Sequence, residues 1–476
     1  MKKPTTLAIV GLLVAIAAAT PSFAQAPAAP SPTKPAGPDI QALDKFIASE
    51  LEARGLVGLS AAVAIDGRIV LAKGYGRAVA GGAPATAETP FAIGSITKQF
   101  TSACILKLAE AGKLQVSDKV AKYYPGLTRA NDITLLDLMN HVSGYHDYYP
   151  LDFVDRPMSK PIDADELIRR FAGRPLDFEP GSNYSYSNTG FVILGRVVEK
   201  VSGRPFGRFL ADEVLAPLGL KHTFYEPDPK APGLARGHTS FALGDPEVAT
   251  PEAHDWIAAA GAIYSTAADL AAWDLALVSG RVLSPASYAL MTGMRQLTDG
   301  RTSFYGCGLA LSFRNRRFVI SHGGAVEGFV ASNLAVPSTR SAAVLLSNYS
   351  GGGPSAIFDR MVDAILPSPT AGVPKIDGPP AVEAQKQMLA AYQAGKVDRA
   401  KLGEEFGYWL TEAKLRAASL KLKPYGEPTK ADVESVNERG GMEVSVVRFT
   451  FAGGTLRGLM YRTPDGKVQQ FFVSKT

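Results

Sequence analysis

The hydrophobic and polar positions change their period along the chain, and each change predicts a different element. Over residues 40–54 apolar residues recur at helical spacing, which predicts an amphipathic helix. Two strand-like runs follow within residues 58–75, and Asp66-Gly67 between them is the dipeptide best suited to a tight hairpin turn. The folded part of the chain is therefore expected to begin with a helix and a β-hairpin.

Helical patterns and loops dominate residues 95–300, whereas residues 304–348 return to strand-like runs. These runs are YGCGLALSF, RRFVISH, FVASNLAV and SAAVLLSN, and a helix is expected over 355–366. Two strands at the front and about three at the back predict one antiparallel sheet whose middle is interrupted by a helical insertion. The expected fold class is α/β (α+β), with an antiparallel sheet flanked by helices and an all-helical lobe.

Composition predicts the division of the chain. Lys2 and Lys3, an apolar run over 7–19 and Ser22-Phe23-Ala24 are typical of an export signal with its cleavage site. The apolar run is shorter than the roughly 20 residues of a bilayer span, so no stable membrane span is expected after cleavage, and the protein should be periplasmic or secreted. The expected parts are a signal peptide (1–24), a Pro/Ala-rich linker (25–38), a main domain (39–366), a Pro-rich linker (367–380) and a small α+β domain (381–476).

Charge and composition exclude several classes of protein. Apolar residues make up 46% of the chain and charged residues 20%, an ordinary globular balance. The formal net charge of +5 falls to +3 without Lys2 and Lys3, and the charges are scattered, so nucleic acid is not an expected partner. Cys104 and Cys307 are expected to be small core residues. No metal or other cofactor is expected, because no metal-ligand spacing joins the histidines, which are His141, His146, His222, His238, His254 and His322.

The first candidate for chemistry is the sequence FAIGSITK at residues 91–98, which opens a run of helix formers ending at Gly112. Ser95 would lie at the N-terminus of this helix, and Lys98 would share its face one turn away. Because the helix is apolar almost all round, burial should lower the proton affinity of Lys98, which could then accept or relay the Ser95 proton. Taken alone, the pair is more typical of an N-cap serine and a lysine that reaches solvent.

The second candidate is PGSNYSYSNTG at residues 180–190, a polar turn before an apolar helix over 191–201. Tyr186 and Asn188 alternate along the chain and so can face one site. A tyrosine hydroxyl beside a lysine could serve as general acid or base, and the asparagine amide could hold the lysine or a substrate carbonyl. By itself this segment could also be a helix-start loop.

The third candidate is His322-Gly323-Gly324 at the end of a predicted strand. Two glycines permit close approach of a substrate backbone, which could pair as an added strand, and the histidine presents a titrating group at the same edge. By itself this segment is more typical of a turn.

Together and in this order, the three motifs resemble those of the penicillin-recognising serine hydrolases: class C β-lactamases, D-Ala-D-Ala carboxypeptidases, D-aminopeptidases and related esterases. Similarity extends over roughly residues 39–366 and includes LLDLMNHVSG at 135–144 and GAIYSTAADLAAW at 261–273. In NHVSG, His141 and Ser143 are given a structural role, and the tyrosines that follow could line the cleft.

The resemblance implies roles for the site residues. Ser95 would be acylated, Lys98 and Tyr186 would share its proton, and Asn188 would position Lys98 and the acyl side chain. His322 would replace the lysine of the lactamases' K-T-G motif. The backbone N–H groups of Ser95 and Ala325 would form the oxyanion hole.

The departures from the family pattern bear on the substrate. His322-Gly323-Gly324 lacks the lysine and threonine that help lactamases bind a substrate carboxylate, so efficient lactam hydrolysis is in doubt. The prediction is an exported serine hydrolase that cleaves amide or ester bonds of a small molecule or peptide, like a D-peptidase, a carboxypeptidase or an esterase. The alternatives are a true β-lactamase and a penicillin-binding or sensor protein that is acylated without turnover. The chain has no G-x-S-x-G, which argues against an α/β-hydrolase.

Overall fold

The computed structural model describes residues 38–475 apart from 150, 152, 243 and 367–372. The predicted signal peptide, nearly all of the predicted linker over 25–38 and part of the linker over 367–380 lie outside the described residues. Within the described part of the chain, no helix combines the length and apolar character that crossing a bilayer requires.

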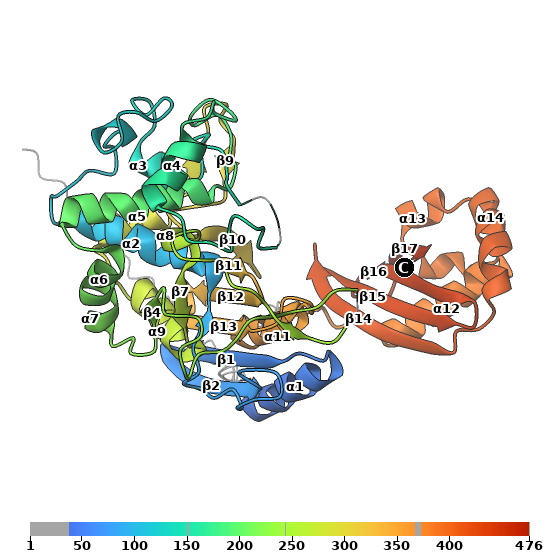
Figure 1. The fold of residues 1–476 in the computed structure, drawn as a ribbon. Helices are drawn as coiled ribbons and strands as arrows, with labels where there is room; N and C mark the ends of the chain where they lie inside the picture. The colour runs from blue at the N-terminus through green and yellow to red at the C-terminus, as the bar shows by residue number, and fades with distance from the viewer. Residues whose placement is uncertain (1–37, 150, 152, 243, 367–372, 476) are drawn as a thin grey trace, which may run out of the picture. The chain divides into compact units, whose positions relative to one another are not determined.

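A six-stranded antiparallel sheet carries the main part of the chain (Figure 1). The strand order β10-β11-β12-β13-β1-β2 brings the N-terminal hairpin onto four strands from the later run, one more than the three predicted. The hairpin joins them through β1, which pairs with β13 so that Ala62 faces Val344. The strands are β1 Gly58–Ile65, β2 Arg68–Gly76, β10 Ala310–Arg314, β11 Arg317–Val326, β12 Phe329–Val336 and β13 Ser341–Ser347.

The central strands β1 and β13 are buried on both faces, because helices cover each face of the sheet. Leu59, Ala61 and Val63 of β1 pack in a cluster with α1 (Ile40–Ala53) and α11 (Ser355–Ile365). Ala62 and Ala64 pack in the cluster on the other face, together with side chains of α9 (Ala267–Val278). A strand buried on both faces needs apolar side chains at successive positions, which explains why β1 is apolar throughout.

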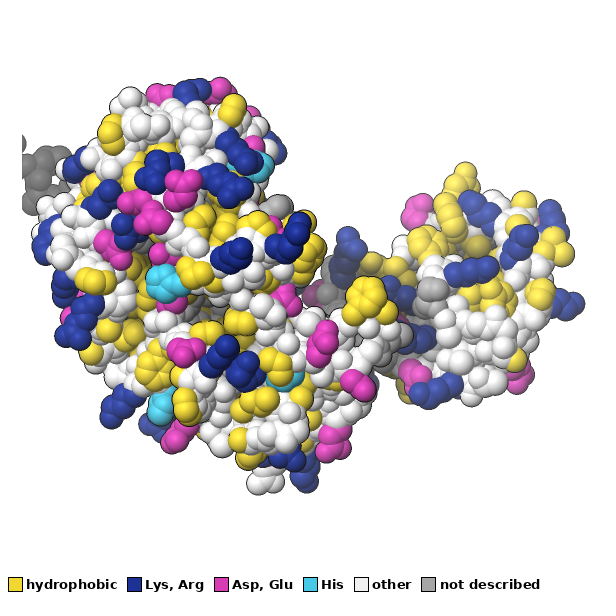
Figure 2. Space-filling view, viewed as in Figure 1, with side chains coloured by type: hydrophobic (Ala, Val, Ile, Leu, Met, Phe, Trp, Pro, Cys, Tyr) yellow, Lys and Arg dark blue, Asp and Glu magenta, His cyan; other side chains and the backbone are white. Residues whose placement is uncertain are grey.

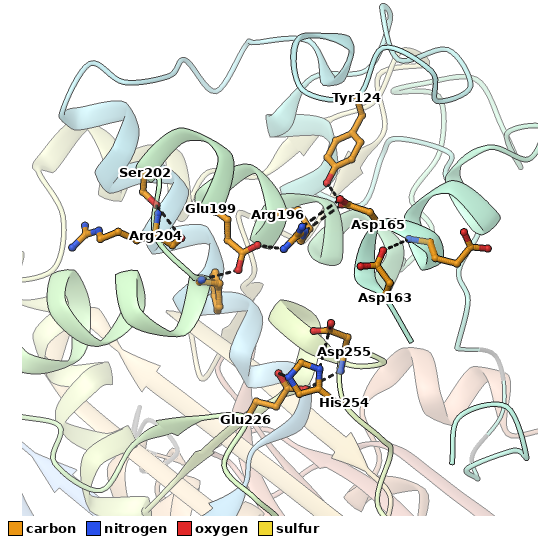
Figure 3. A network of polar contacts seen from close by, with 12 residues as sticks. Tyr124, Asp163, Asp165, Arg196, Glu199, Ser202, Arg204, Glu226, His254 and Asp255 are labelled. Atoms are coloured by element: carbon orange, nitrogen blue, oxygen red, sulfur yellow. Dashed lines mark hydrogen bonds and ion pairs between the residues drawn. The ribbon is translucent and has the colours of Figure 1, made fainter. Parts of the chain in front are cut away.

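Helices α2 (Thr97–Glu110) and α5 (Asn188–Ser202) are neighbours in the helical lobe (Figure 1). Gly203 ends α5 with a φ of 70°, the left-handed conformation that glycine adopts without strain. The Arg196 guanidinium of α5 binds Asp165 at 3.2 Å and so joins this helix to α4 (Figure 3). The remaining helices of the lobe are α3 Leu135–Met139, α4 Ala164–Ala172, α6 Phe206–Leu210, α7 Ala216–Leu218, α8 Ala258–Gly261 and α10 Pro285–Met291.

Short strands connect these helices to the sheet. The pair that matters for the site is β3 (Phe91–Ala92) against β7 (Ile263–Ser265), which holds the segment before Ser95. The other short strands are β4 Phe224–Tyr225, β5 His238–Thr239, β6 Glu247–Val248, β8 Arg295–Gln296 and β9 Thr302–Ser303.

Residues 381–475 contain a hydrophobic cluster of their own, built from Leu389, Phe449 and Phe471 among others. Three helices precede a four-stranded antiparallel sheet of order β14-β15-β16-β17. Three runs of this part of the sequence, VSVVRFTF, TLRGLMYRT and KVQQFFV, are strand-like and predict three strands, and the structure adds β14, whose residues are mostly exposed and polar. The elements are α12 Ala381–Ala394, α13 Glu404–Trp409, α14 Glu412–Leu422, β14 Lys430–Arg439, β15 Met442–Phe451, β16 Gly454–Arg462 and β17 Val468–Lys475.

The two cysteines lie where the sequence placed them. Cys104 and Cys307 are both free and buried, so their prediction as small core residues is confirmed. At the surface, the face shown in Figure 2 carries lysine and arginine side chains interspersed with aspartate and glutamate.

Candidate active site

Ser95 lies in a 3₁₀ turn, Gly94–Ile96, that leads directly into α2. Gly94 adopts a φ of 50°, and a Cβ at this position would come within 2.7 Å of the backbone nitrogen of Ala325. Only glycine therefore lets this turn lie directly against β11. The Ser95 side chain remains partly exposed while the rest of the turn is buried, as a nucleophile that must meet its substrate requires.

Lys98 is fully buried and is held by three hydrogen bonds. Its Nζ donates to Ser95 Oγ at 3.0 Å, to Asn188 Oδ1 at 2.8 Å and to the backbone oxygen of Ala260 at 2.8 Å. Burial lowers the pKa of Lys98 to about 7, while the charge of Asp147 opposes that fall. A lysine with this pKa is partly neutral at physiological pH and can accept a proton from the serine beside it.

Asn188 owes its orientation to Asp147, a residue that the sequence analysis did not single out. Asp147 accepts hydrogen bonds from the Asn188 backbone nitrogen at 2.9 Å and from its Nδ2 at 3.3 Å. With the amide nitrogen turned toward Asp147, the amide oxygen faces Lys98. The carboxylate thus acts on the lysine both through this amide and through its own charge.

Tyr186 covers the other side of Lys98, with its ring centroid 4.8 Å from Nζ. Its buried hydroxyl has no partner at normal hydrogen-bond geometry. Burial raises the pKa of Tyr186, and the nearby Ser95 opposes the rise. The hydroxyl is therefore protonated at neutral pH, which suits a group that relays a proton rather than a resting base.

The Tyr186 segment is positioned by His141, which the sequence analysis assigned a structural role. His141 is buried, its Nδ1 accepts a hydrogen bond from the Ser187 backbone nitrogen at 3.1 Å, and its ring lies 4.2 Å from the Tyr186 ring between centroids. Burial, together with the charge of Lys98, holds the pKa of His141 well below its ordinary value. A neutral imidazole at this position supports the loop without adding a second charge beside Lys98.

The third motif lies directly against the nucleophile turn. A Cβ at Gly324 would come within 1.9 Å of the Ile93 carbonyl oxygen and 3.3 Å of the Ser95 backbone nitrogen. Gly323 and Ala325 alternate with Gly324 along β11 and are exposed. The backbone nitrogens of Ser95 and Ala325 therefore both lie at the contact between the Ser95 turn and β11. An oxyanion hole formed by these two amides is predicted at this contact.

His322 is buried at the site, and each of its ring nitrogens has a hydrogen-bonding partner. It is 7% exposed, its Nε2 is 2.7 Å from the Tyr305 hydroxyl and its Nδ1 is 2.5 Å from the Gly323 carbonyl oxygen. Burial, followed by the charge of Lys98, lowers the pKa of His322 to about 4. At neutral pH His322 is uncharged, so it does not supply the positive charge of the lysine that it would replace.

A small cavity of about 40 Å³ opens at Ser95. Two of the tyrosines expected to line the cleft, Tyr148 and Tyr149, do so, whereas Tyr145 is buried and does not line this cavity. The other lining residues are Asn188, Ile257, Ala260, Gly261, Ala325 and Val326. The structure thus brings all the predicted site residues to one place.

Three contributors to the site were missed in the sequence. Ala260 acts through its backbone oxygen, for which no side-chain signal exists. Tyr305 was included in a strand-like run, and Asp147 lies only three residues after the NHVSG motif. A polar residue among the tyrosines after that motif was the one available signal for Asp147.

Comparison with known families agrees with this geometry. A sequence model of the beta-lactamase family matches residues 43–368, and the chain belongs to that family. The predicted resemblance to penicillin-recognising serine hydrolases and the predicted fold class are both confirmed.

Among curated proteins, the chain is 28% identical over 338 residues to a D-aminopeptidase of Brucella anthropi. That match covers 70% of this chain but only 64% of the relative. A putative penicillin-binding protein PbpX of Bacillus subtilis is 29% identical over 309 residues, which cover 63% of this chain and 73% of the relative.

Solved structures show the same fold. D-amino acid amidase from Ochrobactrum anthropi SV3, in complex with L-phenylalanine amide, superposes with a TM-score of 0.60 at 25% identity, covering 68% of this chain and 98% of the other. The octameric penicillin-binding protein homologue from Pyrococcus abyssi superposes with a TM-score of 0.63 at 22% identity. That second likeness covers 92% of this chain and 96% of the other, so it extends beyond the family match.

Proposed function

We propose that this protein hydrolyses amide bonds of amino-acid amides or short peptides through an acyl-enzyme on Ser95, with activated esters as further substrates. The contact between Lys98 Nζ and Ser95 Oγ, at 3.0 Å, carries the proposal. A lysine pKa near 7 makes this contact a proton-transfer path at physiological pH.

The steps follow from the positions of the side chains. Ser95 Oγ attacks the substrate carbonyl carbon as its proton passes to Lys98, and the backbone amides of Ser95 and Ala325 stabilise the oxyanion. The C–N bond then breaks, and the departing amine takes a proton from the Tyr186 hydroxyl, which regains one from Lys98, so that the serine proton leaves with the amine. Water next attacks the ester on Ser95, which releases the carboxylic acid and returns a proton to Ser95 Oγ.

The neutral His322 favours substrates that carry no carboxylate at this edge. A carboxypeptidase substrate or a β-lactam presents a carboxylate, which a cation would hold most strongly. Here the group at the corresponding position is an uncharged imidazole already bound to Tyr305. Relatives named D-aminopeptidase and D-amino acid amidase support an amide substrate and a preference for the D configuration.

Turnover of matched substrates tests the proposal. D-alanine p-nitroanilide should be hydrolysed faster than its L enantiomer and faster than a chromogenic cephalosporin, and Ser95→Ala should abolish all turnover. Ser102→Ala is the matched control, because Ser102 is buried in the same helix and its hydroxyl has no partner. Cephalosporin turnover at the rate of the amide would favour a β-lactamase, and a stable adduct by intact mass without turnover would favour a penicillin-binding protein. Unchanged hydrolysis in Ser95→Ala would refute the nucleophile.

Export to the periplasm or medium is also proposed, on the strength of the charged and apolar pattern over residues 1–24. Expression of the full chain in a Gram-negative host, followed by N-terminal sequencing of the periplasmic fraction, tests it. A mature protein beginning at Gln25 is the expected result, whereas uncleaved protein confined to the cytoplasm would contradict it.

A further inference from the structure

A second, larger cavity adjoins the one at Ser95. It has a volume of about 290 Å³, and Ile257 and Val326 line both cavities. Tyr149, which lines the cavity at Ser95, donates a hydrogen bond from its hydroxyl to Glu252 in the larger one at 2.6 Å. A substrate attached at Ser95 can therefore extend into this space, which we call the acidic pocket because of the side chains described next.

The acidic pocket is lined by four carboxylates: Glu226, Asp228, Glu252 and Glu327. No lysine or arginine is among the described residues that line it, and its only basic side chain is His254, which is exposed. Burial and the charge of Glu252 raise the pKa of Glu327, as expected for a carboxylate with a like charge nearby and no cation to balance it.

Glu226 and His254 line one part of the acidic pocket, and both belong to a cluster with Asp255 (Figure 3). Glu226 accepts a hydrogen bond from the Asp255 backbone nitrogen at 2.9 Å, and His254 lies 3.4 Å from Glu226. Glu226 therefore already has hydrogen-bonding and charged partners within this cluster. Glu252 and Glu327 stand apart from this cluster, and Glu252 accepts hydrogen bonds from Tyr149 and from the Glu327 backbone through a single oxygen, Oε1.

The rest of the acidic pocket is apolar or aromatic, with Phe329, Tyr264 and Ile257 among its lining residues. Carboxylates beside aromatic rings suit an organic ammonium group, since both attract the cation while the rings cover its carbon atoms. Glu226, His254 and Asp255 converge closely enough to hold a metal ion, with ligand atoms within 4.8 Å of one another, but Glu252 and Glu327 are not part of that group.

We infer that the acidic pocket binds the protonated amine of the substrate, with Glu252 and Glu327 as the residues that recognise it. The inference rests on the proposed function and narrows it to substrates with a free amino group near the scissile bond. Such a substrate is an amino-acid amide or the N-terminal residue of a peptide, as opposed to an N-acylated one.

Kinetics on paired substrates test the inference. D-alanine p-nitroanilide carries the amine, N-acetyl-D-alanine p-nitroanilide lacks its charge, and p-nitrophenyl acetate has no amine at all. Glu252→Gln keeps an oxygen for the hydrogen bonds from Tyr149 and the Glu327 backbone, so the local structure should survive. It should reduce kcat/KM for the free amine by at least about tenfold, the value of a charge-assisted hydrogen bond, and leave the acetate unchanged.

Glu327→Gln should act in the same direction, and Glu166→Gln, an exposed carboxylate on α4, is the matched control. An equal loss on all three substrates, or no loss on the free amine, would overturn the inference while the hydrolase activity remained. If the unsubstituted protein showed no Ser95-dependent turnover of any of the three substrates, the proposed function itself would be refuted.

Ligand binding to the Ser95→Ala variant tests the inference in the absence of turnover. By calorimetry at pH 7, D-phenylalaninamide should bind at least about tenfold more tightly than its N-acetyl form, and the added substitution Glu252→Gln should remove the difference. Equal affinities would overturn the inference. So would tight binding of Zn²⁺ that His254→Ala abolishes and that displaces the amine, because the pocket would then be a metal site.

Discussion

Two buried basic side chains, Arg462 and Lys98, differ in the groups that accept their hydrogen bonds. Arg462 in β16 has a side chain only 3% exposed and forms an ion pair with Glu443, with donor–acceptor distances of 2.9 and 2.6 Å. A further hydrogen bond reaches the Pro379 carbonyl at 2.8 Å. Lys98 is equally buried, yet all three of its hydrogen-bond acceptors are uncharged.

The difference separates a charge that holds the fold from one suited to the proposed proton transfer. A buried cation with a carboxylate in direct contact keeps its proton, which suits Arg462. Lys98 is kept apart from Asp147 by the Asn188 amide, so burial outweighs the carboxylate and its pKa falls to about 7. Burial of Lys98 without a contacting carboxylate thus lowers the free energy of unfolding but yields a lysine that can act as the proposed base.

The largest effect should come from removing Lys98, the proposed base. Lys98→Met should lower kcat/KM by roughly 10⁴-fold, the upper range for loss of a general base, because no other base contacts Ser95 Oγ in the described structure. Arg462→Met should leave kcat/KM of the folded protein unchanged. Steady-state rates on one amide substrate measure both, and a Lys98→Met enzyme within tenfold of the parent would break the comparison.

Stability should respond in the opposite order. Arg462→Met leaves Glu443 buried and unpaired, so it should lower the free energy of unfolding by about 3–5 kcal/mol. Lys98→Met removes a poorly solvated charge and should leave stability unchanged or raise it by about 1 kcal/mol. Urea unfolding followed by circular dichroism gives both values, and strong destabilisation by Lys98→Met would show that the lysine also holds the fold.

Glycines sharpen the comparison in the same two regions. Gly324→Ala places a Cβ within 1.9 Å of a backbone oxygen that cannot move without the Ser95 turn, so kcat/KM should fall by about 10²-fold. In the matched change Gly458→Ala, the new Cβ would come within 2.3 Å of Gln385 Oε1, at the end of a side chain. This change should affect stability alone. Equal kcat/KM values for the two variants would show that the close contact between Gly324 and the Ile93 carbonyl oxygen does not position Ser95.

The smallest effect should appear in the pH profile. Because Lys98 must be neutral to accept the proton, kcat/KM should rise with pH and level off above about pH 7. Asp147 favours the charged lysine, so Asp147→Asn should move this rise to lower pH. Asp299→Asn, an exposed surface change, should not move it, and a shift of Asp147→Asn toward higher pH would show that the carboxylate does not act through its charge.

The chain order of elements was predictable because local periodicity carries it. The hairpin at Asp66-Gly67 and the helix over 355–365 appear where the pattern indicated. Strand β14 was not recognised, because its exposed face leaves few apolar residues to reveal it. The run YGCGLALSF contains most of β10, but the number of later strands was predicted as about three rather than four, since β10 is a short edge strand with little buried surface.

The candidate site was predictable in its residues but not in their charges. Ser95, Lys98, Tyr186, Asn188 and His322 stand in motifs whose spacing the sequence displays directly. The neutral state of His322 required its burial and its contact with Tyr305, neither of which a motif contains.

The sequence by itself determined the candidate nucleophile, the lysine beside it and the glycines that let two backbones meet, because these depend on residue type and short-range spacing. Only the tertiary structure decided how far the Lys98 pKa falls, where Asp147 acts and which carboxylates gather in the acidic pocket. Those properties depend on distances and dielectric surroundings among segments far apart in the chain, which burial and packing establish only after folding.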